Sequence, residues 1–131
     1  MKKDIVVPKV EDVYVAAVKG YNELHRTEDW NIYIINNKSV ALEMILIVST
    51  GYSSDKITST MRHKLEALPP KSYAKVELIM EDLLSLKNEF LVTFFQDNKM
   101  YDKSFVFEPN TINNLSLKKL PLIKELGVLA N

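Results

Sequence analysis

The sequence contains no cysteine and only three glycines among its 131 residues. Without cysteine, the chain can form no disulfide, has no thiolate nucleophile and offers no cysteine ligand for zinc. The glycines, Gly20, Gly51 and Gly127, are each isolated. Loops that cradle phosphates need clustered glycines, because their backbone N–H groups must approach the anion closely. The P-loop and dinucleotide-binding fingerprints are therefore absent.

An excess of charge of one sign is also missing, since 17 Lys and Arg residues balance 17 Asp and Glu residues. Proteins that bind nucleic acid or anionic membranes usually carry a basic excess, so we expect neither partner. Two lysines near the start suggest a signal peptide, but Asp4, Pro8 and Glu11 interrupt any apolar core. No run approaches the roughly 18 apolar residues of a membrane span. We expect a cytoplasmic protein.

What the sequence does contain is a series of short runs rich in β-branched and aromatic residues. The length suits one domain, residues 1–131, and the hydrophobic fraction of 47% is that of ordinary globular proteins. Turn-forming residues separate the runs, as in "NNKS", "QDNK" and Pro69-Pro70. The pattern predicts seven strands, over residues 13–18, 30–35, 42–49, 58–68, 73–79, 90–95 and 101–107.

The stretch "KSYAKVELIMEDLLSLKN" matches two templates. As a strand, it places Ala74, Val76 and Leu78 on one face and Glu77 on the other. As a helix, it forms an apolar stripe at i, i+3, i+4, i+7 spacing. We predict a strand over 73–79 followed by a helical turn over 81–86. The fold is then an all-β sandwich of about seven strands, and the alternative is an α+β fold with a helix at 72–87.

The order of these signals over residues 30–107 resembles immunoglobulin-like bacterial sandwich domains. The shared features are an asparagine-turned hairpin, a strand running into "LPP", a strand after the prolines and a closing hairpin. The Cys…Trp…Cys pattern of antibody domains is absent. The resemblance implies an immunoglobulin-like β-sandwich.

Three further stretches, "TSTMRH", "LPPKSYAKVE" and "NEFLVTFF", resemble a group of short bacterial proteins that carry the name of phenylalanyl-tRNA synthetase. That name implies ATP-dependent aminoacylation or an accessory role beside the synthetase. A class II synthetase core is much larger than this chain and uses arginines on ATP. This sequence has only Arg26 and Arg62.

The segment "ELHRTEDW" is the densest in residues suited to recognition. It combines His25, Arg26, Asp29 and Trp30, which offer a stacking ring, a guanidinium group and a carboxylate. These residue types are frequent at binding hot spots. The structural alternative is a polar loop before a strand, with Trp30 buried as a core anchor.

The second histidine, His63, shares the apolar side of its predicted strand with Met61 and Leu65, whereas Arg62 points the other way. A histidine there could be a catalytic base, a metal ligand or a core residue that bonds a backbone carbonyl. No nucleophile, base or ligand pattern stands near it, and we favour the core role. The sequence indicates no catalytic residue, no metal site and no cofactor, and it leaves Arg62 and His63 as candidate binding residues.

The central strands are apolar on both faces, unlike the strands of a plain two-layer sandwich. Their second faces must therefore be covered by another part of the chain or by a second protein. These candidate interface residues are Tyr33, Ile35, Ile45, Ile47, Leu91 and Phe95.

Residues 113–131 are too rich in leucine for a free tail, so we divide the chain into a sandwich core at 1–112 and a C-terminal packing segment. We expect short helical turns there, capped by Asn114 or Ser116. The segment is predicted to pack on the outer face of Ile45, Ile47, Leu91 or Phe95, in its own chain or in a partner.

These observations favour a non-enzymatic interaction or structural module that associates with a protein partner or with itself as a homodimer. One alternative is a small-ligand-binding protein or enzyme with a pocket near His25, Arg26, Trp30 and His63. Another is an accessory protein linked to phenylalanyl-tRNA synthetase, which rests on the resemblance alone.

Overall fold

Long runs of β-branched and aromatic residues pair as antiparallel strands in the computed structural model, which describes residues 8–131. The strands are β1 (Val13–Asn22), β2 (Thr27–Asn36), β3 (Leu42–Tyr52), β4 (Met61–Leu68), β5 (Ser72–Ile79), β6 (Lys87–Gln96), β7 (Lys99–Phe107) and β8 (Gly127–Leu129). The helical elements of these residues are two 3₁₀ turns, η1 (Glu81–Leu83) and η2 (Asn114–Ser116). The signal-peptide argument rests partly on residues 1–7, which lie outside the described residues.

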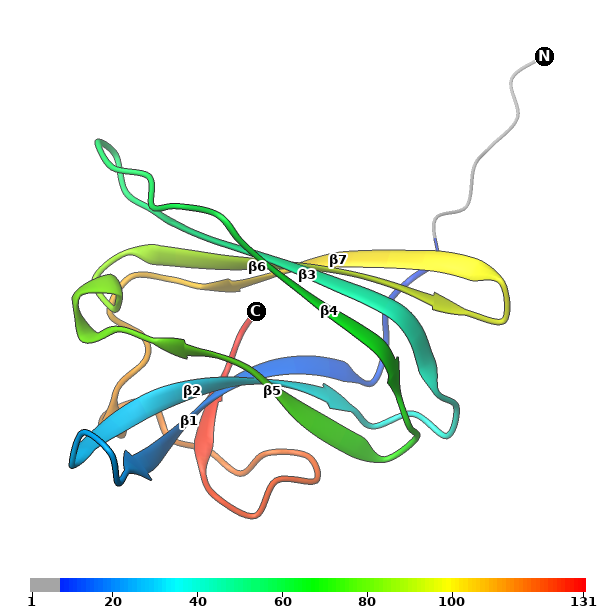
Figure 1. Ribbon diagram of the computed structural model, residues 1–131, viewed down its shortest axis with the longest axis horizontal. Helices are drawn as coiled ribbons and strands as arrows, with labels where there is room; N and C mark the ends of the chain where they lie inside the picture. The colour runs from blue at the N-terminus through cyan, green and yellow to red at the C-terminus, as the bar shows by residue number, and fades with distance from the viewer. Residues whose placement is uncertain (1–7) are drawn as a thin grey trace.

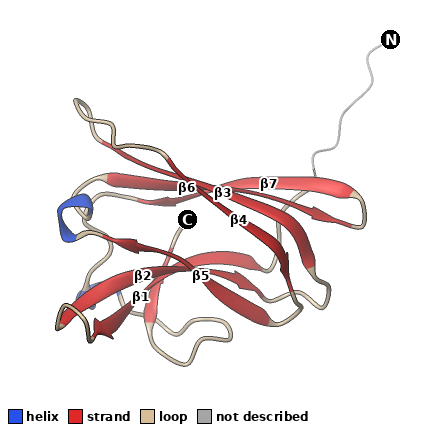
Figure 2. Ribbon diagram, in the orientation of Figure 1, coloured by secondary structure: helices blue, strands red, loops and turns tan. Residues whose placement is uncertain are grey.

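The strands form two four-stranded sheets that lie one above the other (Figure 1). Sheet 1 has the order β5-β2-β1-β8 and sheet 2 the order β4-β3-β6-β7, with all neighbours antiparallel. Strands dominate the described chain (Figure 2). The predicted all-β sandwich is confirmed, with eight strands in place of seven. The alternative helix over 72–87 does not form, because residues 72–79 are β5.

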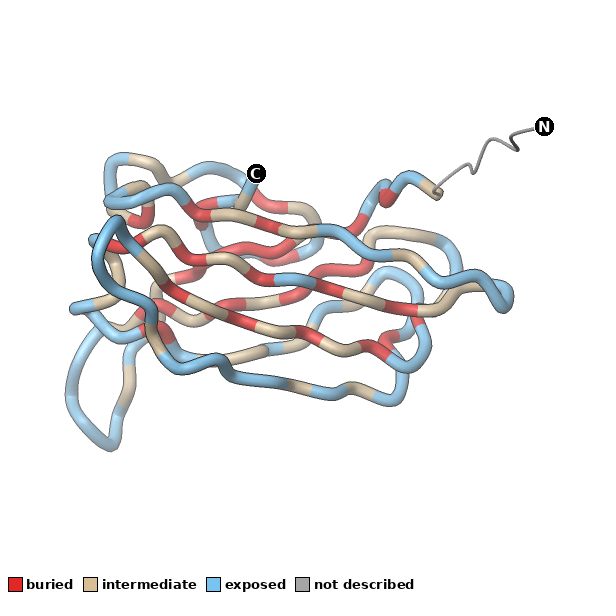
Figure 3. Tube along the Cα trace, turned by 90° about the horizontal axis from the view of Figure 1, so that it is seen from above, coloured by how far each residue is buried: buried red, intermediate tan, exposed pale blue. Residues whose placement is uncertain are grey.

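The inner faces of the two sheets make the core. Buried residues alternate with more exposed ones along the strands (Figure 3). The largest fully buried side chains include Phe90, Phe94, Phe105 and Phe107 from sheet 2, and Ile32 and Ile34 from sheet 1. Burying one such side chain contributes roughly 1.5–3 kcal/mol. The contact between the two inner faces is therefore the chief source of stability.

An irregularity in β3 reverses the predicted faces of two isoleucines. Between Glu43 and Leu46 the pairing with β6 shifts register, and Met44 adopts a positive φ of 49°. An extra residue in a strand moves the side chains beyond it to the opposite face. Ile45 and Ile47 are consequently core residues, each 1% exposed. Their predicted place in an outer interface is wrong, and Leu46 faces outward instead.

The Asn36 side chain links the β2–β3 turn to the β4–β5 turn. Its buried amide nitrogen donates to the carbonyl oxygens of Val40, Leu68 and Pro69 at 2.9, 3.1 and 3.0 Å. Its side-chain oxygen accepts from the N–H of Lys38 at 3.0 Å. An unpaired buried amide costs roughly 1–3 kcal/mol, so these bonds hold the β2–β3 turn against the β4–β5 corner.

The C-terminal segment covers the outer face of sheet 1. Leu120 and Ile123 are each 5% exposed and belong to a second buried cluster with Ala16, Val18 and Ile35. Tyr14 and Tyr33 pack against this cluster. In Figure 1 the segment, drawn in orange and red, passes beneath the lower sheet. The predicted position of the tail on Ile45, Ile47, Leu91 or Phe95 is therefore wrong.

The pairing of β8 with β1 explains why the tail lies on sheet 1. Val128 pairs with Ala17 in the middle of this short ladder. Gly127 stands where the tail approaches β1 most closely, since a Cβ there would lie 2.6 Å from both the Ala17 carbonyl oxygen and Leu120 Cδ1. Contacts this short exclude any side chain, so the glycine is required for the strand to dock.

Helical structure in the tail is limited to η2. Its cap is Asn113, whose side chain accepts from the N–H of Leu115 at 2.8 Å, in place of the expected Asn114 or Ser116. The single turn is followed by irregular chain up to β8. None of the helices within residues 8–131 has the length and apolar character needed to cross a membrane.

The tail offers a direct test of its packing. Ile123→Asp places a carboxylate in the second buried cluster, and we expect a loss of about 3 kcal/mol in the free energy of unfolding. Leu126→Asp is the matched control, because Leu126 is 53% exposed in the same segment. Chemical denaturation of both variants checks the prediction. Equal stability of the two would show that the tail does not cover sheet 1 through Ile123.

Candidate functional site

His63 lies in β4 with its side chain on the inner side of sheet 2. His63 pairs with the buried Ile47, and Leu65 pairs with the buried Ile45. His63 and Leu65 therefore lie on the same face of β4, as the sequence predicts. The His63 side chain is 24% exposed. A half-buried imidazole at this position needs a polar partner, because loss of water without a hydrogen bond is costly.

That partner is a carboxylate and not the expected backbone carbonyl. His63 Nε2 lies 2.7 Å from Glu77 Oε1. An ionised carboxylate only accepts hydrogen bonds, so this contact with an ionised Glu77 requires a proton on Nε2. Glu77 belongs to β5 in sheet 1. The contact therefore joins the two sheets across the side of the sandwich where β4 and β5 are the edge strands.

A bulge in β5 turns Glu77 inward. Ile32 of β2 pairs with Glu77, but the next residue of β2 pairs with Lys75, so Val76 is an extra residue. Bulges redirect the side chains beyond them. Strict alternation would put Glu77 on the same outward face as Lys75. Because of the bulge, Glu77 pairs with the buried Ile32 and faces the inside of the sandwich. Sequence reasoning missed Glu77 because no residue in this strand signals the bulge.

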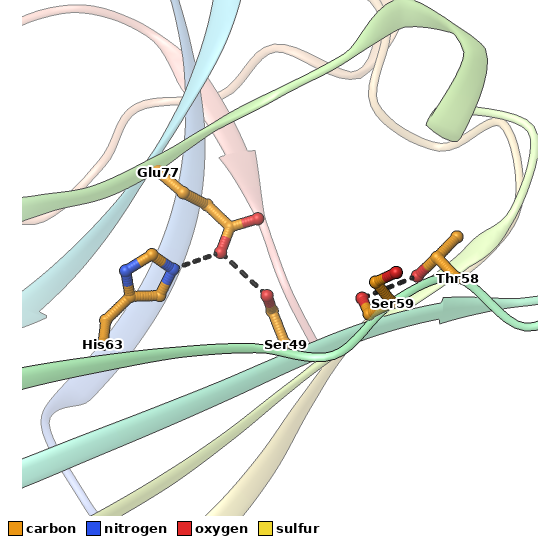
Figure 4. Close-up of polar contacts among 5 residues, drawn as sticks. All are labelled: Ser49, Thr58, Ser59, His63 and Glu77. Atoms are coloured by element: carbon orange, nitrogen blue, oxygen red, sulfur yellow. Dashed lines mark hydrogen bonds and ion pairs between the residues drawn. The ribbon is translucent and has the colours of Figure 1, made fainter.

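Ser49 of β3 completes the arrangement. Its Oγ donates to the same Glu77 oxygen at 2.8 Å (Figure 4). We call Ser49, His63 and Glu77 the clasp. The Glu77 side chain is 10% exposed, and its two hydrogen bonds compensate for the lost contact with water.

The opposite side of the sandwich is closed by the end of the chain. Ala130 N–H donates to the Val15 carbonyl of β1 at 2.9 Å. Asn131 and Val106 of β7 exchange backbone hydrogen bonds of 2.9 and 3.0 Å. Polar contacts thus connect the two sheets on both sides.

The clasp has the residue types of a hydrolase triad but not its connectivity. In a triad, the histidine stands between the carboxylate and the serine, so that it can remove the hydroxyl proton. Here Glu77 stands in the middle, and Ser49 donates to Glu77. This order of contacts fits a link between sheets, because the Ser49 hydroxyl contacts the carboxylate and not the imidazole.

A hollow of about 200 Å³ adjoins the clasp. Its walls include Thr58 and Ser59, drawn in Figure 4, together with Met61, Leu83 and Phe90. Pockets for drug-sized ligands usually measure about 300–1,000 Å³. The hollow is below that range.

The other candidate residues lie away from the clasp. His25 and Arg26 are exposed in the β1–β2 turn, where Asn22 Oδ1 accepts from the N–H groups of Leu24 and His25. Arg26 adopts a positive φ of 54°. The turn is thus stabilised by the side chain of Asn22.

Asp29 and Trp30 follow that turn in β2. Asp29 accepts from Thr27 Oγ1, and Trp30 is 7% exposed in the core, with Lys19 Nζ 5.6 Å from its ring centroid. A hollow of about 370 Å³ is lined by both, but His25, Arg26 and His63 are not part of it. Arg62 and His63 belong to sheet 2, so the six predicted binding residues do not converge on one site.

Residues 8–131 contain no group of three His, Asp or Glu side chains arranged to hold a metal ion. No protein-family model matches the sequence, and a search of curated proteins finds no relative. Fold and site together define an all-β sandwich domain with a polar clasp between its sheets.

The clasp predicts energetic coupling between two strands of different sheets. In a double-mutant cycle of His63→Ala and Glu77→Ala, we expect a coupling free energy of about 1 kcal/mol, because each single change removes the contact between these two side chains. Urea denaturation of the four proteins measures it.

The control cycle replaces His63→Ala with His25→Ala, since His25 lies in an exposed turn. Its effect should add to that of Glu77→Ala within about 0.5 kcal/mol. Additivity in both cycles would mean that His63 and Glu77 do not stabilise one another.

Proposed function

We propose that the protein is a non-enzymatic interaction module whose docking surface is the outer face of sheet 2. The observation that carries the proposal is an apolar stripe on this face. The stripe consists of Leu46, Val48, Leu91, Phe95 and Met100. Leu91 and Met100 are 42% and 54% exposed, and neither buried cluster of residues 8–131 includes any member of the stripe.

The two outer faces of the sandwich differ in how they are covered. On sheet 1, Leu120 and Ile123 of the tail bury the apolar side chains of β1 and β2. On sheet 2, the upper layer of Figure 1, no described strand or turn lies over the outer face. Contiguous exposed apolar side chains commonly mark interaction sites. Leu91 and Phe95 remain candidate interface residues in this proposal, and Leu46 and Val48 replace Ile45 and Ile47.

The β7 edge of sheet 2 is less suited to docking, because it already pairs at Val106 with Asn131. An edge docks a partner by offering unpaired backbone groups, whereas a face docks through its side chains. The stripe therefore favours docking by the face.

The strand order supports an immunoglobulin-like sandwich. In immunoglobulin domains the strands A, B and E are neighbours in one sheet and C, F and G in the other. Here β1, β2 and β5 are neighbours in sheet 1, and β3, β6 and β7 in sheet 2. β4 lies beside β3, where variable-type domains add a further strand. We place the module in the cytoplasm, which agrees with the lack of cysteine.

Photo-crosslinking within cells that make the protein tests the docking surface. A photoreactive amino acid at Leu91, in the centre of the stripe, should give a covalent adduct with another protein chain, either a second copy or a different protein. Leu24 is the control, because it is 85% exposed at the tip of the β1–β2 hairpin. Mass spectrometry identifies the adduct. Absence of any adduct at Leu91, or equal yields at the two positions, would contradict the proposal.

A further inference from the structure

The hollow beside the clasp contains a hydrogen-bond acceptor that the clasp leaves unused. His63 and Ser49 both contact the same oxygen of Glu77, Oε1. The second carboxylate oxygen, Oε2, has no hydrogen-bond partner among the described residues. In Figure 4 this oxygen points away from His63, to the side where Thr58 and Ser59 lie. Glu77, Thr58 and Ser59 all line the hollow, so Oε2 is open to a ligand there.

Asn88 of β6 supplies a second unused acceptor to the same hollow. Its side chain is fixed, because Nδ2 donates to the carbonyl oxygens of Leu83 and Leu86 at 2.9 and 3.1 Å. The residue is 5% exposed, and its Oδ1 accepts no hydrogen bond from the part of the chain that the structure describes. A Cβ on Gly51 would lie 3.0 Å from this Oδ1, so the oxygen faces the space that the glycine leaves open. Buried polar atoms are nearly always paired, so both acceptors call for a donor.

The hollow also carries a negative charge without a cation beside it. Glu77 is the one charged residue among the described residues that line it. A neutral imidazole and a hydroxyl satisfy the hydrogen bonds of Oε1 but not the charge of the carboxylate. The neighbouring cations are directed elsewhere. Arg62 pairs with the outward Val48, and Lys87 Nζ lies 5.7 Å from the Tyr52 ring centroid.

We propose that this hollow binds a primary ammonium group carried on a short apolar stem. An ammonium group has a positive charge for Glu77 Oε2 and three N–H donors, one of which suits Asn88 Oδ1. Met61, Leu83 and Phe90 form apolar walls against which methylene groups can pack. The volume of about 200 Å³ restricts the ligand to a small one.

The clasp prepares the site for this ligand. The contacts of Oε1 with His63 and Ser49 hold the Glu77 carboxylate in place, so Oε2 is oriented before a ligand arrives. Binding groups that are already ordered lose little conformational freedom on binding. A hard cation such as Ca²⁺ or Mg²⁺ suits the hollow less well, because these ions take six or more oxygen ligands and the walls are largely apolar.

Two sources can supply such a group, which are a free small amine and the side chain of a lysine from another protein. The probe n-butylammonium represents both, since it has the four carbons and the ammonium group of a lysine side chain. In a nuclear magnetic resonance titration of the full chain, we expect saturable shifts of the Gly51 amide and Met61 methyl signals. A ligand of this size binds with a dissociation constant in the millimolar range. The neutral analogue 1-butanol should bind at least about tenfold more weakly, because it lacks the charge.

Glu77→Gln removes the charge and keeps the shape of the side chain. It should raise the dissociation constant of n-butylammonium by about tenfold or more. Thermal unfolding verifies that this variant is folded.

Met61→Lys tests the site without changing the clasp. Met61 is 48% exposed at the edge of the hollow, so a lysine there can place its own ammonium group inside and should abolish the shifts caused by the probe. The matched control is Met44→Lys, because Met44 is 70% exposed near the opposite end of β3. It should leave the dissociation constant unchanged.

A second probe, Nα-acetyl-lysine N-methylamide, distinguishes the two sources. Similar affinity for both probes would identify the ligand as a lysine side chain. Binding of n-butylammonium alone would identify a free amine, because the backbone groups of the second probe would then be excluded.

The inference would be overturned by the absence of saturable shifts up to about 50 mM n-butylammonium. Equal affinity for 1-butanol would also overturn it, since the hollow would then bind apolar stems without regard to charge. So would unchanged affinity in Glu77→Gln or in Met61→Lys. None of these outcomes affects the proposed docking surface, because no residue of the apolar stripe lines the hollow.

Discussion

The structure depends on one constraint, which is that the central strands are apolar on both faces. The two sheets have four faces, and two of these faces bury each other in the core of the sandwich. The third is covered by the C-terminal segment, whose Leu120 and Ile123 lie on β1 and β2. The fourth, on β3 and β6, has no cover among residues 8–131, and the stripe through Leu91 is the result. The arrangement of the tail and the exposed stripe are two consequences of the same excess of apolar surface.

Closure of the sides of the sandwich uses a different kind of contact. Apolar packing is not directional and does not by itself align one sheet with the other. The clasp of Ser49, His63 and Glu77 is directional, and so are the backbone bonds between Asn131 and Val106. A hydrogen bond has a preferred distance and angle, so these contacts fix how one sheet lies relative to the other. The largely buried Glu77 carboxylate, 10% exposed, has two hydrogen-bond partners that compensate for its loss of contact with water.

The side chains suited to catalysis are not assembled in one place in the described residues. The two histidines belong to separate places, His25 in an exposed turn and His63 inside the clasp. Ser49 contacts Glu77, so the order of the clasp residues differs from that of a nucleophilic triad. The outer face of sheet 2, by contrast, carries the apolar stripe among charged side chains of both signs, such as Lys64, Glu66 and Asp102. Such a surface is suited to recognition of another folded chain.

The sequence by itself determined the class of fold and most of the strands, because alternation in runs such as 30–35 and 90–95 reflects a local property of the extended chain. It also determined that apolar faces would exceed what two sheets can bury. Tertiary structure decided the faces of Ile45, Ile47 and Glu77, since the bulges at Met44 and Val76 arise from pairing with other strands. It also decided the place of the tail, because the three residues of β8 form a strand only against β1. A register shift of one residue exchanges inner and outer faces, and no local pattern in the chain records which partner strand imposes it.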